Sequence, residues 1–331
     1  MNLYEAFGAD RLQGLDGVTV ESVAENWEGG FASLLSQAAS LLPGSLGEGL
    51  RAALAIVAVA ALCAVADSVV EGAPARYVQL AGVLAIAALT VTGLNSLMGA
   101  GRDAIGQMNA YSKALLPAMA AASAASGQPA SALFRHAGTL LASDLLITLY
   151  DRLLYPLLYV YAALVTFNAA LPHDMVKRIA GLVKWAVGGA LTVSLVLFTA
   201  YLTIGGAISG SADAVSVKAA KTALGGFVPV VGGIISDASE TLLLGAAVIK
   251  NAVGIFGLLA VLGIALGPCV ALAARCLCVK LGAALAGTLG GEGLALYIDS
   301  LAGLYSMMLG LVSASAFLLI ISIVSAIMAG G

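Results

Sequence analysis

The sequence predicts an all-α, polytopic integral membrane protein built as a bundle of helices. Of its 331 residues, 61% are hydrophobic and 10% are charged, and the mean hydropathy is +1.03. A soluble domain carries about 25% charged residues, and burying this much apolar surface in water would need a larger core than the chain can enclose. The apolar stretches are long, rich in Ala and Leu and without alternation, which favours helices over strands. Aromatic residues make up 6% of the chain, which argues against the aromatic girdles of a membrane β-barrel.

Residues 1–50 are expected to form an acidic amphipathic head, extracytoplasmic or interfacial, ahead of a transmembrane domain at 51–331. Seven acidic residues and one arginine give the head a net charge of −6, against +3 for the remainder. Residues 14–42 predict short amphipathic helices on the membrane surface, ended by Pro43 and Gly44. Lys and Arg collect on the cytoplasmic side, which favours a head on the other side. The first thirty residues lack the pattern of a signal peptide.

Stretches without charged residues predict about seven or eight membrane spans. Spans without helix breakers are predicted between Arg51 and Asp67, between Arg76 and Arg102, and at 153–171 and 185–210, near 251–274 and 276–290 (which contains Lys280), and at 300–329. A run of 25 residues, as in the second of these, makes about 37 Å of helix at 1.5 Å per residue. Pro156 is expected to kink the start of its span. The loop 172–184 carries Lys177, Arg178 and Lys184 and is expected on the cytoplasmic side, while 212–224 is expected to lie at the interface.

Two segments contain helix breakers and predict broken helices. The segment 113–135 would be a broken helix or a re-entrant hairpin, with 137–150 as its other limb or as a short span. The second broken segment lies near residues 225–233. Such backbone is tolerated at membrane depth only against protein or a water-filled cavity. The breakers are Pro117, Gly127 and Pro129 in the first segment and Gly225, Gly226, Pro229, Gly232 and Gly233 in the second.

A helix with a polar face is predicted directly after the second broken segment, with Ser236 as its N-cap. Asp237, Glu240, Thr241 and Asn251 fall near one face at steps of three and four, and Lys250 lies beside it. In one interpretation this face lines a pathway, because ionisable residues inside a membrane usually mark one. In the other, the segment is an aqueous loop, the acids are helix caps, and Lys250 snorkels to the interface.

Other ionisable residues allow the same two interpretations. Asp144 lies in an apolar segment, whereas the adjacent Asp151 and Arg152 are expected in an interfacial loop. His136 and His173 are expected at the level of the lipid headgroups. Glycine pairs four residues apart, such as Gly263 and Gly267, predict tight helix packing.

An internal duplication of residues 76–171 and 178–290 is one interpretation of a recurring pattern. Ala-Leu-Thr-Val begins at residues 88 and 190, and Asp-Ala, a lysine and a proline follow each time. The spacings drift, so chance similarity in a chain rich in Ala and Gly is the alternative. If the duplication is real, the two broken segments occupy matching positions, as in many transporters.

No catalytic, cofactor or metal site is predicted. The sequence has no Walker A, HExxH or GxSxG motif and no basic patch for nucleic acid. Of the four cysteines, Cys276 and Cys278 are close in sequence but have no second pair or histidine nearby, so a zinc site is not expected. Any transport would therefore draw energy from a partner or a gradient.

Residues 212–257, ADAVSVKAAKTALGGFVPVVGGIISDASETLLLGAAVIKNAVGIFG, resemble the signature region of the stage III sporulation protein AE family. The segment ALLPAMAAASAASGQPASALF, beginning at Ala114, is similar to the family's earlier proline and Ser-Gly segment. The end of the chain, SIVSAIMAGG, resembles its last apolar span. The resemblance covers roughly residues 50–331, and family members usually begin with a signal peptide, which this sequence lacks.

The resemblance implies a permease-like component of a transenvelope channel that links mother cell and forespore during endospore formation. It implies a place in the mother-cell membrane around the forespore, and a requirement for forespore development. The implied partners are the other stage III sporulation operon proteins, namely ring-forming proteins, a cytoplasmic ATPase and small membrane proteins, and the forespore-side stage II sporulation protein Q. Two alternatives stay open: a stand-alone secondary transporter driven by a proton or ion gradient, and a structural scaffold for the complex.

Overall fold

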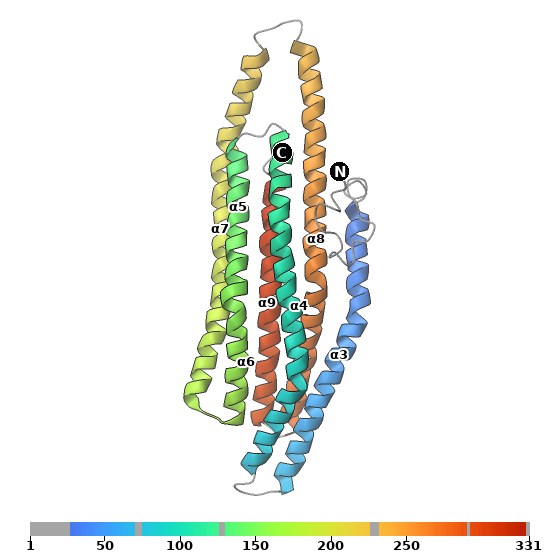
Figure 1. The fold of residues 1–331 in the computed structure, drawn as a ribbon, viewed down its shortest axis with the longest axis vertical. Helices are drawn as coiled ribbons and strands as arrows, with labels where there is room; N and C mark the ends of the chain where they lie inside the picture. The colour runs from blue at the N-terminus through green and yellow to red at the C-terminus, as the bar shows by residue number, and fades with distance from the viewer. Residues whose placement is uncertain (1–26, 70–74, 126–129, 226–231, 290–291, 329–331) are drawn as a thin grey trace.

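The computed structural model describes residues 27–69, 75–125, 130–225, 232–289 and 292–328 (Figure 1). For residues 27–29, 75, 115–125, 130–137, 140, 203–225, 232–253 and 325–328 it describes the backbone alone. The elements are α3 (Trp27–Val69), α4 (Ala75–Ala125), α5 (Ala130–Leu149), the π-helical turn η2 (Tyr150–Leu154), α6 (Tyr155–Ala170), α7 (Asp174–Gly225), α8 (Gly232–Thr288) and α9 (Glu292–Met328). Within these ranges no strand occurs, and the predicted all-α class is confirmed.

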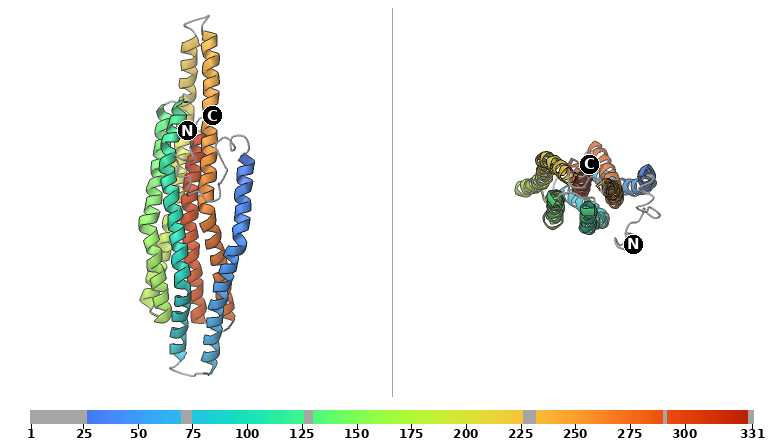
Figure 2. Two further views of the ribbon diagram at one scale, coloured as in Figure 1. Left: turned by 45° about the vertical axis from the view of Figure 1, so that its right-hand side comes forward. Right: turned by 90° about the horizontal axis from the view of Figure 1, so that it is seen from above.

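The helices form an elongated bundle in which sequence neighbours run in opposite directions (Figures 1 and 2). Helices α5 and α6 join through η2 into one continuous rod, so the bundle contains six rods. The start of α3 lies toward the same end of the bundle as the end of α9, and the connection between α6 and α7 lies at the opposite end. The distal parts of α7 and α8 extend beyond all the other helices (Figure 1).

Six helices of the described part of the chain are long and apolar enough to cross a membrane, against seven or eight predicted. They cover Gly30–Val69, Arg76–Ala114, Leu141–Ala170, Asp174–Leu202, Gly254–Thr288 and Glu292–Val324. The difference arises because the sequence analysis took some charged residues as the ends of spans. Arg275 was one such end, yet it lies inside α8, where its Nη1 donates to the Glu48 carbonyl at 3.3 Å. The predicted spans 251–274 and 276–290 are therefore one helix.

Two predicted helix ends at prolines are wrong. Helix α3 continues through Pro43, and α4 continues through Pro117 to Ala125. A proline inside a helix removes one backbone hydrogen bond and crowds the preceding turn, but the remaining hydrogen bonds of a long helix can hold it straight. Helix α8 likewise contains Pro268. Proline alone was therefore a poor guide to where the helices end.

The turn η2 occurs next to Pro156, where the sequence predicts a kink. The Tyr155 N–H donates to the Tyr150 carbonyl, five residues earlier, and Pro156 has no N–H to continue the α-helical pattern. A widened turn accommodates the proline ring without ending the helix. Asp151 and Arg152 therefore lie within a continuous helical rod, and the interfacial loop predicted for them is wrong.

Helix α9 forms the centre of the bundle. In its most apolar stretch of 18 residues 56% are buried, against 22–39% in the other five spans, and it contacts α8, α4, α6, α5, α7 and α3. Tyr297, Leu304 and Met308 are among its buried side chains. Most sides of α9 therefore pack against other helices, which fits its apolar sequence. The outer helices, in contrast, expose Leu and Val.

Helices approach closely at particular glycines, as expected for a membrane bundle. A Cβ atom on Gly82 of α4 would lie 2.6 Å from Cys63 Sγ of α3, and one on Gly49 would lie 2.9 Å from Cys278 Sγ of α8. In contrast, nothing lies within 4 Å of a Cβ on Gly267. The close contacts that these two glycines allow join α3 to α4 and α3 to α8, whereas Gly267 makes none.

The predicted duplication coincides with two helical hairpins of the same direction. Residues 76–171 cover α4 and the α5–α6 rod, and residues 178–290 cover most of α7 and all of α8. Each begins at the end of the bundle where α6 meets α7 and returns to it (Figure 1). The common origin of the two hairpins stays a prediction.

Candidate functional site

The predicted polar face lies on the first part of α8. Asp237, Glu240, Thr241, Lys250 and Asn251 all precede the apolar span Gly254–Thr288 of the same helix. The helix begins at Gly232, so Ser236 is not its N-cap. The side chains of this part are outside the described residues, and its backbone belongs to the half of α8 that begins at Gly232, the end at which α8 extends beyond the other helices (Figure 1).

The predicted breakers fall into three groups. Gly225 is the last residue of α7, and Gly232 and Gly233 are the first two of α8. Gly127, Pro129, Gly226 and Pro229 lie outside the described residues. Pro117 lies inside α4, as described above.

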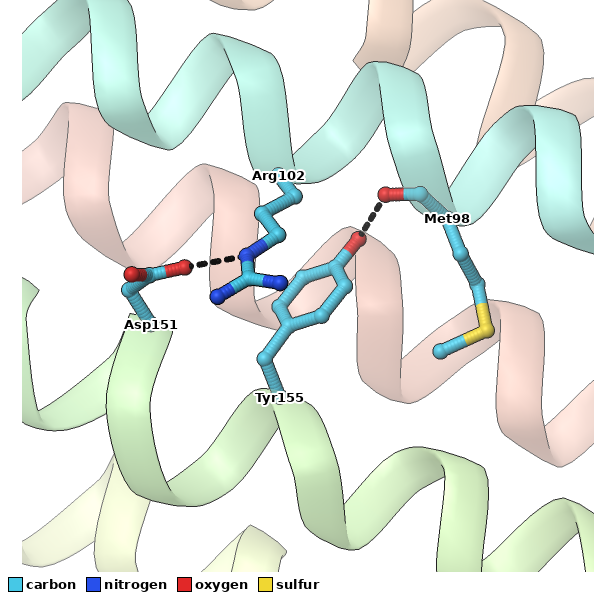
Figure 3. Close-up of polar contacts among 4 residues, drawn as sticks. All are labelled: Met98, Arg102, Asp151 and Tyr155. Atoms are coloured by element: carbon cyan, nitrogen blue, oxygen red, sulfur yellow. Dashed lines mark hydrogen bonds and ion pairs between the residues drawn. The ribbon is translucent and has the colours of Figure 1, made fainter.

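An ion pair joins α4 to the π-helical turn. Arg102 Nε donates to Asp151 Oδ1 at 2.7 Å (Figure 3). The two side chains are 54% and 35% exposed, so the pair lies on the outside of the bundle. Both residues belong to apolar spans, where a charge is costly without a partner. Pairing lowers this cost for both groups.

Tyr155 fixes the same contact from the buried side. Its hydroxyl donates to the Met98 carbonyl at 2.5 Å, one turn before Arg102 on α4 (Figure 3). The Tyr155 side chain is 1% exposed. A Cβ on Gly101 would lie 2.8 Å from the Tyr155 hydroxyl, so this glycine makes room for the ring. The register between α4 and α6 is therefore set by a buried hydrogen bond and an exposed ion pair.

A second pair lies farther along the same two rods. Lys113 Nζ is 3.2 Å from Asp144 Oδ1, at ion-pair distance without the geometry of a hydrogen bond. Six charged residues of these two rods form what we call the polar seam: Arg102, Asp103, Lys113, Asp144, Asp151 and Arg152. The seam carries three positive and three negative charges.

Buried hydroxyl groups connect the α5–α6 rod to the helices on its other sides. Ser143 and Ser322 of α9 share a hydrogen bond of 2.5 Å, and Thr166 and Tyr297 share one of 3.1 Å. Tyr150 of η2 hydrogen-bonds Ser194 of α7. Interhelical hydrogen bonds of this kind stabilise membrane bundles by satisfying polar groups in the protein interior.

The pairs of the seam were not predicted from the sequence. Two interpretations were open for Asp144, and Asp151 and Arg152 were expected in a loop. Arg102 and Lys113 marked the ends of predicted segments. The pairs join residues 49 and 31 positions apart, so sequence spacing alone could not reveal them. The signal in the sequence that could have indicated these pairs was the presence of acidic and basic residues in two consecutive apolar stretches.

Among the described residues, no group of three His, Cys, Asp or Glu side chains is placed to hold a metal ion. All four cysteines are free thiols. The chemistry available at the seam is therefore the pairing, hydrogen bonding and proton exchange of charged side chains.

This architecture defines a polytopic helical membrane protein with paired charges in its apolar spans. The model of the family described as Stage III sporulation protein AE matches residues 18–330, and the chain belongs to that family. A curated relative, Stage III sporulation protein AE of Bacillus subtilis (strain 168), is 31% identical over 206 residues. That similarity covers 61% of this chain and 52% of the relative. No solved structure matches the chain.

Proposed function

We propose that this protein is the permease-like membrane component of a channel or secretion-type complex linking mother cell and forespore. The observation that carries the proposal is membership of the stage III sporulation protein AE family along nearly the whole chain. The six apolar helices support a role within a membrane. The complex would lie in the mother-cell membrane around the forespore, and forespore development would require it.

The proposed partners are proteins that would supply what this chain does not. They are the ring-forming proteins, the cytoplasmic ATPase and the small membrane proteins of the stage III operon, and the forespore-side stage II sporulation protein Q. No nucleotide-binding motif occurs in the sequence, so an ATPase partner would provide energy. Because α7 and α8 extend beyond the other helices, their distal ends would contact a partner outside the membrane.

The proposed pathway follows the polar face of α8. Asp237, Glu240, Thr241, Lys250 and Asn251 would line it, because a helix face with charged, hydroxyl and amide groups favours water and polar solutes over an apolar surface. The glycine and proline residues at the ends of α7 and α8 would allow the chain to turn there. Helix breaks near such a site are typical of proteins that conduct solutes.

Sporulation assays of neutral variants test this role. We expect Asp237→Asn and Glu240→Gln together to lower the yield of heat-resistant spores at least about tenfold, with the protein still assembled with its partners. An equivalent neutral change at Asp174, which lies at the opposite end of the bundle, is the control. Normal sporulation in the double variant would contradict the pathway and favour a structural scaffold. Loss of sporulation in a protein that has no partners would favour a stand-alone transporter.

A further inference from the structure

Two exposed charges of opposite sign flank the Arg102–Asp151 pair. Asp103 follows Arg102 on α4, and Arg152 follows Asp151 on η2; both side chains are exposed. Neither makes an ion pair with another residue of the described part of the chain. Both belong to stretches apolar enough to cross a membrane, where a charge normally meets protein or water. Their surroundings within one copy of the chain do not provide that partner.

Asp103 and Arg152 lie within about 3 Å of each other in depth, because α4 and η2 run in opposite directions and each residue is one helical rise of about 1.5 Å from the aligned pair. The 2.7 Å contact between Arg102 and Asp151 aligns α4 with η2, and the two unpaired charges are each one residue beyond it. One residue of helix corresponds to a rise of about 1.5 Å. A twofold axis parallel to the helices keeps every residue at its own depth, so it can bring Asp103 of one copy close to the level of Arg152 of another.

The face of α4 around Asp103 is made of small residues. Gly99, Asp103, Gly106 and Ala110 follow one another at steps of four, three and four, which places them along one face of a helix. A Cβ added to Gly99 or Gly106 would have nothing within 4 Å. Small residues let another helix approach closely in a membrane, and no helix in the described part of the chain contacts this face at Gly99 or Gly106.

The rod that carries Arg152 exposes large side chains. Leu145 is 67% exposed and Tyr159 is 45% exposed. These residues precede and follow Arg152 by seven positions each. The α4 side of the surface is therefore lined with small residues, and the α5–α6 side carries bulky ones. When two copies meet, the bulky side chains of one can pack against the small residues of the other.

We propose that the surface formed by α4 and the α5–α6 rod binds a second copy of the chain, with Asp103 of each copy against Arg152 of the other. Such a contact is isologous, because the same two residues meet twice across a twofold axis. Arg102, Asp103, Asp151 and Arg152 carry no net charge together, so the surface complements itself better than a purely acidic or basic partner. The contact is independent of the channel role proposed above.

The test uses two full-length copies with different affinity tags, produced together and purified in lipid nanodiscs. Asp103→Arg alone or Arg152→Asp alone places like charges opposite each other twice. We expect each to lower recovery of the second tag at least about tenfold, since every 1.4 kcal/mol is a factor of ten and juxtaposed like charges cost more. Combining one copy of each variant restores both opposite-charge contacts and should return recovery to the wild-type level. The double variant on one chain should do the same.

Lys177→Asp is the matched control, because Lys177 is also an exposed base but lies outside this surface. It should leave recovery unchanged. Single variants that associate as well as the wild type would overturn the proposal, as would single variants that dissociate and are not rescued by mixing. If a single variant does not accumulate alone, restored accumulation in the mixed pair supports the proposal, and its absence contradicts it. Recovery of the operon partners is followed separately, so failure of this contact and failure of the channel role are distinguishable.

Discussion

At the scale of single residues, the α4–α6 contact combines an exposed ion pair with a buried hydrogen bond. Arg102 and Asp151 are partly exposed, whereas the Tyr155 hydroxyl that bonds the Met98 carbonyl is buried. Exposed ion pairs contribute little in water, but a charge left alone in an apolar span is costly. The Arg102–Asp151 pair therefore stabilises the protein mainly because breaking it would leave a charge unpaired in an apolar span.

The ion pair is tested by a double-mutant cycle. Arg102→Gln and Asp151→Asn should each destabilise the protein, because each leaves the opposite charge unpaired. The double variant should lose less than the sum, with a coupling free energy of about 1 kcal/mol. Thermal unfolding in nanodiscs measures the three variants. Strictly additive losses would show that the two groups do not interact.

Tyr155→Phe tests the buried hydrogen bond. The change leaves the Met98 carbonyl without the tyrosine donor, and we expect a loss of about 1 kcal/mol in the free energy of unfolding. Tyr159→Phe is the control, since Tyr159 lies on the same helix and is partly exposed. Equal effects of the two substitutions would contradict the assigned role of the hydroxyl group.

At the scale of the elements, sequence analysis located the apolar stretches well and their ends poorly. Charge-free runs correctly marked helices because backbone groups in lipid can be satisfied within a helix. The runs were divided at Arg275 and at Asp151 and Arg152, yet helix α8 and the α5–α6 rod continue through these residues. A charged side chain that reaches a carbonyl or a partner on a neighbouring helix does not end its own helix, and that partner is invisible in the sequence.

One part of the candidate site could be predicted from the sequence, and the other part could not. The polar face at 237–251 is a pattern within one segment, so sequence analysis could propose it, and it stays a prediction. The polar seam depends on two antiparallel rods being placed side by side. Arg102 and Asp151 are far apart in sequence, and η2 shifts the helical phase just before Pro156. Helical periodicity alone could not anticipate that phase.

Glycine contacts between α3 and α4 are tested by a matched pair of alanine variants. Gly82→Ala should destabilise the protein because its Cβ would lie 2.6 Å from Cys63 Sγ and 3.1 Å from Leu294 Cδ1. Gly47→Ala meets no atom within 4 Å and should be neutral or stabilising by up to about 1 kcal/mol, the difference in helix propensity. Thermal unfolding of both variants provides the comparison. Equal stability of the two would contradict the close packing at Gly82.

At the scale of the whole molecule, one membrane crossing by each of the six apolar helices of the described residues would place the start of α3 and the end of α9 on the same side. The short connection between α6 and α7 then lies on the other side, next to Lys177 and Arg178. Those basic residues agree with a cytoplasmic location of the connection. The described helices thus give a definite expected topology, which the predicted seven or eight spans could not.

Cysteine labelling from each side of the membrane tests this topology. In a variant whose four native cysteines are replaced by alanine, a cysteine at Pro172 should react with an impermeant reagent from one side only. A cysteine introduced at Phe31, near the start of α3, should react from the opposite side. Reaction of both from the same side would contradict six crossings.

Purification from sporulating cells is the strongest test of the proposal that this chain works as part of a transenvelope complex. The tagged protein is extracted in mild detergent, and the proteins that accompany it are identified by mass spectrometry. We expect the ring-forming proteins and the ATPase of the stage III operon to be recovered with it. A protein recovered alone, under conditions that keep a known membrane complex intact, would contradict the channel role and favour a stand-alone transporter.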